Sequence, residues 1–168
     1  MPDQPAPPLA IFLHGSIGVG KTTLGTALAA RLGGAYVDGD QYQRRDRPWF
    51  ASSLSVARGM TEAAIGYAEL GAPVVLGYPL RCIDHLYLKG KLARAGMRAL
   101  FVNLAPPLDA IFGPGRGRTF TDWERGRTAE MIEQGYNHRP WSDARVDTSG
   151  PQDESVRLLA KAVEGLAV

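Results

Sequence analysis

The octapeptide GSIGVGKT (15–22) directly follows the apolar run LAIFLH (9–14) and matches the pattern G-x-x-x-x-G-K-T in full. Glycines let such a turn wrap so closely that successive backbone N–H groups point inward, and a helix starting there adds its positive end. The Lys21 ammonium suits phosphate oxygens, and the Thr22 hydroxyl suits Mg²⁺. With a strand before it and a helix after it, the pattern predicts a phosphate-binding loop. The residues expected to bind the nucleotide here are Gly15, Ser16, Gly18, Val19, Gly20, Lys21, Thr22 and Thr23.

Short apolar runs alternate with helical patterns along the rest of the chain. The expected strands are 9–14, 35–38, 73–77, 98–104 and 144–148. The expected helices are 20–32, 49–70, 82–95, a short one after Pro107, 121–134 and a last one from Pro151. Apolar strands separated by helices favour a parallel sheet covered on both faces, which is a three-layer α/β/α sandwich. In the helix 82–95, Ile83, Leu86 and Tyr87 share one apolar face.

Composition bounds the remaining possibilities. The chain has 168 residues, 45% of them hydrophobic, and a net charge of +2, which favours one globular domain and no polyanionic partner such as nucleic acid. No apolar run approaches the roughly 18 residues of a membrane span, so no membrane partner is expected. Residues 1–8 resemble no secretory signal and are expected to form a disordered tail before a single domain, 9–168, of a cytoplasmic protein. Cys82 is expected to be a small buried side chain.

Two carboxylates end the second expected strand. Asp38, Gly39 and Asp40 follow one another there, whereas the third and fourth strands end in Gly77-Tyr78-Pro79 and Asn103-Leu104-Ala105 without a carboxylate. The carboxyl ends of parallel strands meet at one edge of the sheet, so this pair should lie beside the phosphate loop. One carboxylate there can support the water shell of a metal ion while the other takes a proton from an acceptor hydroxyl.

These features together resemble the P-loop small-molecule kinases of the shikimate kinase and gluconate kinase group, with adenylylsulfate kinase and chloramphenicol phosphotransferase as relatives. The resemblance rests on the phosphate loop, the Asp38–Asp40 pair, VDTS (146–149) and DRPW (46–49), which is similar to a gluconate kinase pattern. The acceptor-binding segments differ from both groups, because only Gln41 to Arg45 separate the Asp pair from DRPW and no triple glycine follows the third strand. Neither group's substrate therefore carries over.

The resemblance implies a five-stranded parallel sheet of order 2-3-1-4-5 and transfer of the ATP γ-phosphate to a small-molecule hydroxyl, with ATP and Mg²⁺ as cofactors. It implies that Asp38 and Thr22 serve the metal and that Asp40 binds and deprotonates the acceptor. A mobile lid over about 113–140 would bring Arg116 and Arg118 over the phosphates. Lys21, Asp40 and Arg118 are then the expected catalytic residues. Ser149 and Pro151, after the fifth strand, are expected to hold the adenine.

Arginines also gather where the acceptor should bind, after the second and third strands. Clustered guanidinium groups at strand ends favour an acceptor that carries carboxylate, phosphate or sulfate. The residues expected to bind the acceptor are Asp40, Arg44, Arg45, Arg58, Tyr78 and Arg81. Arg81 is the foremost of the arginines because it directly follows a strand end.

Two other functions remain open at this point. A 5′-hydroxyl polynucleotide kinase also combines a phosphate loop with Asp and Arg, although the near-neutral charge weighs against a polyanion groove. A regulatory module that only binds ATP is the second, although binding alone needs no second carboxylate. The partners expected are ATP and a small hydroxyl-bearing molecule, and the chain is expected to be a monomer or a homodimer. Three histidines and one cysteine form no zinc pattern, and His14 is expected to be packed.

Overall fold

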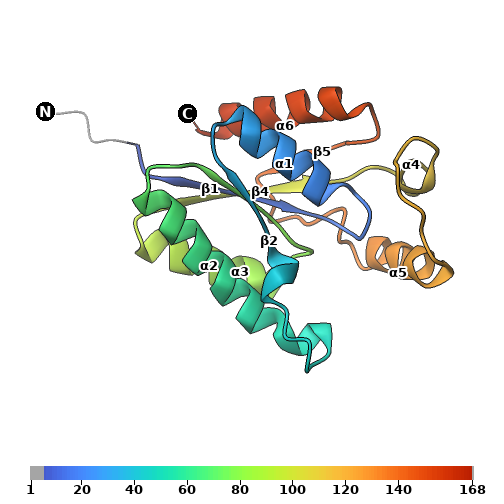
Figure 1. Ribbon diagram of the computed structural model, residues 1–168, viewed down its shortest axis with the longest axis horizontal. Helices are drawn as coiled ribbons and strands as arrows, with labels where there is room; N and C mark the ends of the chain where they lie inside the picture. Colours follow the sequence, from blue (N-terminus) through green and yellow to red (C-terminus); the bar gives the residue numbers. More distant parts are fainter. Residues whose placement is uncertain (1–5, 168) are drawn as a thin grey trace, which may run out of the picture.

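A parallel sheet forms the centre of the computed structural model, which describes residues 6–167 (Figure 1). Its strands are β1 (Leu9–His14), β2 (Ala35–Asp38), β3 (Val74–Gly77), β4 (Arg98–Leu104) and β5 (Ala144–Val146). They pair in the order β2-β3-β1-β4-β5, all parallel. This confirms the sheet, its order and its five strands, with β5 two residues shorter than expected. Residues 1–5, which belong to the predicted disordered tail, lie outside the described residues.

Helices cover both faces of the sheet (Figure 1). The α-helices are α1 (Lys21–Arg31), α2 (Ser53–Glu69), α3 (Cys82–Arg94), α4 (Leu108–Phe112), α5 (Asp122–Glu133) and α6 (Gln152–Ala167), and the 3₁₀ helices are η1 (Gly39–Tyr42) and η2 (Trp49–Ser52). Alternate β1 residues point to opposite faces: Ile11 and Leu13 join the core under α1 and α6, while Ala10 and Phe12 join the core under α2 and α3. Helices α4 and α5 lie beyond the carboxyl edge of the sheet (Figure 1). No helix within 6–167 has the length and apolar character needed to cross a membrane.

The buried face of α3 differs from the expected one. Ile83 and Leu86 are 68% and 63% exposed, and the helix instead buries Asp84, His85, Leu88 and Leu92. Polar residues occupy the inner face because each has a partner there: Asp84 binds Arg81, and His85 stacks on Trp141. Cys82, at the start of the helix, is exposed rather than buried.

A stack of three aromatic rings closes one end of this core. Trp141 lies between His14 and His85, with ring centroids 4.7 and 4.3 Å away. Burial, together with the nearby charges of Lys21 and Arg139, lowers the pKa of His14 to about 3, so this imidazole is neutral at physiological pH. The prediction that His14 is a packed histidine is confirmed.

Candidate active site

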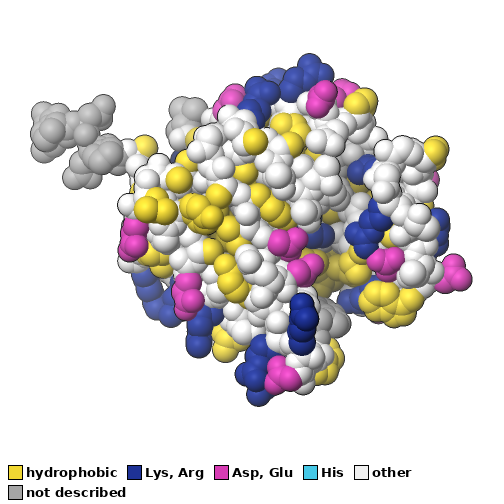
Figure 2. Space-filling view, in the orientation of Figure 1, with side chains coloured by type: hydrophobic (Ala, Val, Ile, Leu, Met, Phe, Trp, Pro, Cys, Tyr) yellow, Lys and Arg dark blue, Asp and Glu magenta, His cyan; other side chains and the backbone are white. Residues whose placement is uncertain are grey.

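A cleft of about 930 Å³ opens at the carboxyl edge of the sheet. The phosphate loop (15–22) forms its floor, and the ends of β2 and β3 form one wall. The segment from Ala110 to Met131 and residues 148–152 form the other walls. Figure 2 shows the hollow between the body of the molecule and the α4–α5 segment, with acidic and basic side chains around its rim. This is the edge at which open parallel sheets bind ligands.

Glycines in the phosphate loop are required by backbone conformation and by space. Gly15 and Gly18 have φ of 151° and 80°, in the region that disfavours L side chains. A Cβ at Gly15 would lie 2.7 Å from the Leu104 carbonyl oxygen, and one at Gly18 would lie 2.6 Å from the Phe120 ring. The loop is therefore closed in from both sides, by the end of β4 and by the segment before α5.

Lys21 lies at the base of the cleft, at the first residue of α1. Its Nζ donates to the Ser16 carbonyl at 2.6 Å and to the Gly15 carbonyl at 3.2 Å. Burial of the ammonium lowers the pKa of Lys21 to about 8, although Asp40 and Asp38 act in the opposite direction. An anion bound in the loop would supply the counter-charge that this buried ammonium requires.

Asp38 joins the phosphate loop to the turn after β2. Its Oδ2 accepts a hydrogen bond of 3.1 Å from Thr22 Oγ1, and its Oδ1 accepts one of 3.0 Å from the Asp40 backbone N–H. Hydroxyl and carboxylate oxygens side by side at a phosphate loop are the hard donors that Mg²⁺ takes alongside water and phosphate oxygens. Thr22 and Asp38 therefore fit the metal expected there.

Asp40 lines the cleft together with Lys21, and its carboxylate is bound by a residue that the sequence did not single out. Gln43 Nε2 donates to Asp40 Oδ1 at 3.0 Å and reaches Tyr78 Oη at 3.3 Å. Partial burial and the Asp38 charge raise the pKa of Asp40, while Lys21 lowers it. Asp40, Gln43 and Tyr78 thus form a polar row along one wall of the cleft. The position of Gln43 three residues after Asp40, in a 3₁₀ turn, is a local signal that could have identified it.

Three arginines of the expected lid line the opposite wall: Arg116, Arg118 and Arg127. The guanidinium of Arg116 donates to the carbonyls of Ala110 and Thr148 at 3.1 and 2.8 Å, so its position is fixed. The Arg118 side chain is 49% exposed and pairs with Glu124 at 2.6 Å. Arg127, which lies within the expected lid, pairs with Glu130 and reaches the cleft from the middle of α5.

The chain after α5 is attached to the phosphate loop. Asn137 Oδ1 accepts a hydrogen bond of 2.8 Å from the Ser16 backbone N–H, and Asn137 is buried. The Asn103 side chain donates to the Tyr136 carbonyl and accepts from the Arg139 N–H. This support has no local signal in the sequence, because its partners lie far apart in the chain. Residues 136–139 are thus fixed against the sheet, although they fall within the expected lid.

The structure brings together most of the predicted site. The predicted residues that line the cleft are Gly18, Gly20, Lys21, Thr22, Thr23, Asp38, Asp40, Tyr78, Arg116, Arg118, Ser149 and Pro151. Gly15, Ser16 and Val19, which belong to the same loop, are buried and do not line the cleft. The predicted acceptor-binding arginines Arg44, Arg45, Arg58 and Arg81 do not line the cleft.

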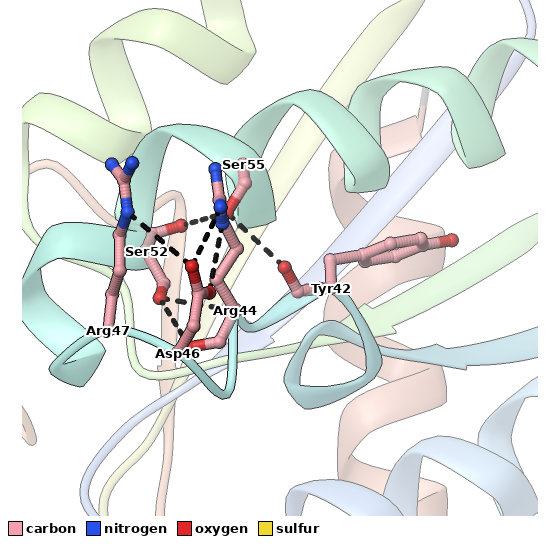
Figure 3. A network of polar contacts seen from close by, with 6 residues as sticks. All are labelled: Tyr42, Arg44, Asp46, Arg47, Ser52 and Ser55. Carbon is pink, nitrogen blue, oxygen red and sulfur yellow. Dashed lines mark hydrogen bonds and ion pairs between the residues drawn. The ribbon is translucent and has the colours of Figure 1, made fainter.

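Two of these arginines form ion pairs with acidic residues close by in the sequence instead of lining the cleft. Arg44 binds Asp46 through two hydrogen bonds of 3.1 and 2.8 Å, and its backbone exchanges hydrogen bonds with the Ser52 hydroxyl (Figure 3). Arg81 binds Asp84 in the same two-pronged way at 3.1 and 3.3 Å. Their acidic partners, two and three residues along the chain, are visible in the sequence. The side chain of Trp49, the last residue of DRPW, lies outside the described part of the structure.

Comparison of the coordinates with solved structures identifies the fold. A gluconokinase from Sinorhizobium meliloti 1021 is similar with a TM-score of 0.77 and 21% sequence identity, covering 95% of this chain and 94% of that one. The fold is that of the P-loop kinases. This confirms the resemblance inferred from the sequence at the level of fold.

Other structures with the P-loop kinase fold match over similar lengths. An adenylylsulfate (APS) kinase from Mycobacterium tuberculosis, solved with AMPPNP and APS, has a TM-score of 0.69 at 19% identity and covers 95% of this chain and 99% of that one. A shikimate kinase from Bacteroides thetaiotaomicron has a TM-score of 0.64 at 18% identity and covers 93% of this chain and 98% of that one. No family model and no curated protein matches the sequence.

Proposed function

We propose that this protein is an ATP- and Mg²⁺-dependent phosphotransferase that moves the γ-phosphate of ATP to a hydroxyl of a small molecule. The observation that carries the proposal is that Asp40 lines the same cleft as Lys21, close enough for the two charges to interact. A base on one wall and a phosphate-binding ammonium on the floor leave room between them for a hydroxyl in line with a phosphoryl group. The P-loop kinase fold of the solved relatives supports the same reaction class.

Each residue has a distinct part in this reaction. Asp40 accepts the proton of the acceptor hydroxyl as its oxygen bonds to the γ-phosphorus, while the bond from phosphorus to the β–γ bridging oxygen breaks and ADP leaves. Lys21 and the loop N–H groups hold the phosphates, and Arg118 neutralises the charge that develops on the transferred group. Thr22 and Asp38 would hold Mg²⁺, which supplies further neutralisation of phosphate charge.

The proposal also covers the end of the cleft where the adenosine of ATP would bind, called the nucleoside end below. Ser149 and Pro151 lie where the chain leaves β5, and the Ser149 N–H is fixed by a hydrogen bond of 2.9 Å to Asp147 Oδ1. Backbone groups of such a turn can read the edge of an adenine, and Arg116 closes the same end through its bond to Thr148. A cytoplasmic location and a monomeric or homodimeric state remain predictions.

Two variants and one control test the reaction. Asp40→Asn keeps the shape of the side chain but cannot accept a proton, so kcat should fall by about 100-fold or more while the Kd for ATP stays within about threefold. Lys21→Ala should abolish both transfer and tight ATP binding. Asp109→Asn, which neutralises an exposed carboxylate outside the cleft, should match the parent protein. The readouts are ADP release with a hydroxyl-compound panel and titration with a non-hydrolysable ATP analogue.

The same panel separates the alternatives. Full turnover by Asp40→Asn would show that Asp40 is not the general base. ATP hydrolysis that no acceptor stimulates would favour a regulatory ATP-binding module. Transfer to a 5′-hydroxyl oligonucleotide, with a Michaelis constant that rises steeply with salt, would favour a polynucleotide kinase.

A further inference from the structure

The cations of the cleft all lie beside the phosphate loop. Within residues 6–167, the cations lining the cleft are Lys21, Arg116, Arg118 and Arg127. Thr128, next to Arg127, donates to the Ile17 carbonyl at 3.5 Å, and the Arg118 guanidinium packs on Phe120, whose ring covers Gly18. These positive groups therefore match the negative charge of a triphosphate rather than that of a second substrate.

Arg81, three residues after Tyr78 in the chain, is held in an ion pair that belongs to the fold. Its guanidinium binds both oxygens of Asp84, and its backbone N–H donates to Asp84 Oδ2 at 2.9 Å in the capping box of α3. Asp84 is only 5% exposed, so release of Arg81 toward a substrate would leave a buried carboxylate without its counter-ion. The ion pair between Arg81 and Asp84 thus serves the fold rather than the binding of an acceptor.

Arg44 is likewise held in an ion pair, with Asp46. Its bidentate bond to Asp46 and the bonds of its backbone to Ser52 close the loop between η1 and α2, and Arg47 Nε approaches the same carboxylate at 3.9 Å (Figure 3). Ser55 donates to the Tyr42 carbonyl and ties the loop to η1. The two guanidinium groups face Asp46, and neither Arg44 nor Arg47 lines the cleft.

What remains at the acceptor wall is polar and negative. Asp40 offers carboxylate oxygens, Gln43 an amide and Tyr78 a phenol, joined by hydrogen bonds of 3.0 and 3.3 Å. These are groups that exchange hydrogen bonds with hydroxyls. Asp40 gives this wall its negative charge, so an acceptor with a negative charge of its own would be repelled there.

From this arrangement we infer that the acceptor is an uncharged polyhydroxyl compound, a sugar or sugar alcohol, rather than the acidic acceptor that the arginine-rich sequence suggested. The inference rests on the proposed function and names its substrate class. Asp40, Gln43 and Tyr78 each bind a hydroxyl of the acceptor, and Asp40 takes the proton from the one that is phosphorylated.

The test compares acceptors that differ only in charge. Sets of sugar alcohol, sugar acid and amino sugar alcohol with the same chain length and stereochemistry are assayed with ATP and Mg²⁺, and the products are identified by mass spectrometry. The uncharged member should show the highest kcat/KM, by about tenfold or more over the acid. A higher kcat/KM for the acid or the amine overturns the inference and leaves the proposed function intact. Transfer to none of them, while another compound of the hydroxyl panel is phosphorylated, overturns the inference alone; ATP binding with transfer to no acceptor at all overturns both.

Variants of Arg81 and Arg44, the two arginines held in local ion pairs, test the inference independently. If Arg81 or Arg44 bound an acceptor anion, Arg81→Gln or Arg44→Gln would lower kcat/KM for the acid about tenfold or more relative to the neutral compound. The inference expects this ratio to stay constant in both variants, and a selective loss with the acid overturns it. Asp84→Asn removes the carboxylate that holds Arg81. This variant should therefore raise the kcat/KM for the acid relative to that for the neutral compound. Circular dichroism and thermal melting establish that each variant is folded.

Discussion

The backbone N–H of Ser16 donates a hydrogen bond of 2.8 Å to Asn137 Oδ1, across 121 residues of sequence. Ser16 belongs to the phosphate loop, and Asn137 follows α5, the helix that carries Arg127. Both partners are buried, so the hydrogen bond cannot be replaced by one to bulk water. The shape of the phosphate loop therefore depends on the segment that anchors α5.

Removal of the Asn137 side chain should affect stability and nucleotide binding together. Asn137→Ala leaves the Ser16 N–H buried without an acceptor, which costs about 1–3 kcal/mol of unfolding free energy. The Kd for ATP should rise as well, because the loop loses its support. Gln134→Ala is the matched control, since that amide is exposed and binds only Glu130 on its own helix. Urea unfolding and ATP titration measure the two effects, and an unchanged Kd in a destabilised Asn137→Ala protein would limit the role of Asn137 to folding.

Two glycines of α2 should respond in opposite directions to alanine. Gly66 has open space where a Cβ would go, so Gly66→Ala should stabilise the protein by about 0.5–1 kcal/mol through helix propensity. At Gly59 the added Cβ would overlap the Tyr42 ring and push η1 away from the helix. Gly59→Ala should therefore lower the melting temperature, by about 2–4 °C for each kcal/mol lost. Calorimetry of both variants checks the pair, and equal shifts would contradict the packing of Tyr42 on Gly59.

Nucleotide binding should take up protons in alkaline solution. The pKa of Lys21 is about 8 in the open cleft, below its ordinary value of 10.5. Above that pKa the ammonium is largely neutral, and a bound triphosphate restores its charge, so ATP binding at about pH 9 should absorb close to one proton. Calorimetry in buffers of different ionisation enthalpy measures the uptake. Lys21→Arg, whose side chain stays charged, should bind ATP without it, and equal uptake by that variant would assign the proton to another group.

Arg116 and Arg118 should differ in which kinetic constant they control. Arg116 is fixed by two backbone carbonyls beside the nucleoside end, so Arg116→Ala should mainly raise the KM for ATP. Arg118 is half exposed and bound only to Glu124 and Phe120, and it can turn toward the transferred phosphate. Arg118→Ala should lower kcat by about 100-fold with little change in KM. Steady-state kinetics at varied ATP decides the assignment, and the reverse pattern would exchange the two roles.

The sequence predicted the features that depend on short stretches of chain. The phosphate loop, the Asp38–Asp40 turn and the alternation of strands with helices are local patterns, and the edge of a parallel sheet then brings their ends together. The ion pairs that hold Arg81 and Arg44 outside the cleft are also local, because Asp84 and Asp46 stand three and two residues away in the sequence.

Other features required contacts that no short stretch contains. The inner face of α3 is polar because Trp141, far along the chain, supplies a ring for His85 to stack on, which hydrophobic spacing does not register. The support of Ser16 by Asn137 and of Tyr136 by Asn103 is equally remote in sequence. Buried polar residues are predictable only when their partners are known.

The sheet order has a consequence for how the chain folds as it is synthesised. Strand β1 precedes the other four strands of the sheet in the chain and lies at its centre, paired with β3 and β4. Its partner residues for Ala10 are Val74 and Ala99, so this apolar strand leaves the ribosome long before either neighbour exists. Parallel pairing over such separations makes folding slow and leaves strand edges open to aggregation. The strand that ends at the phosphate loop is thus the one that a nascent chain must protect for longest.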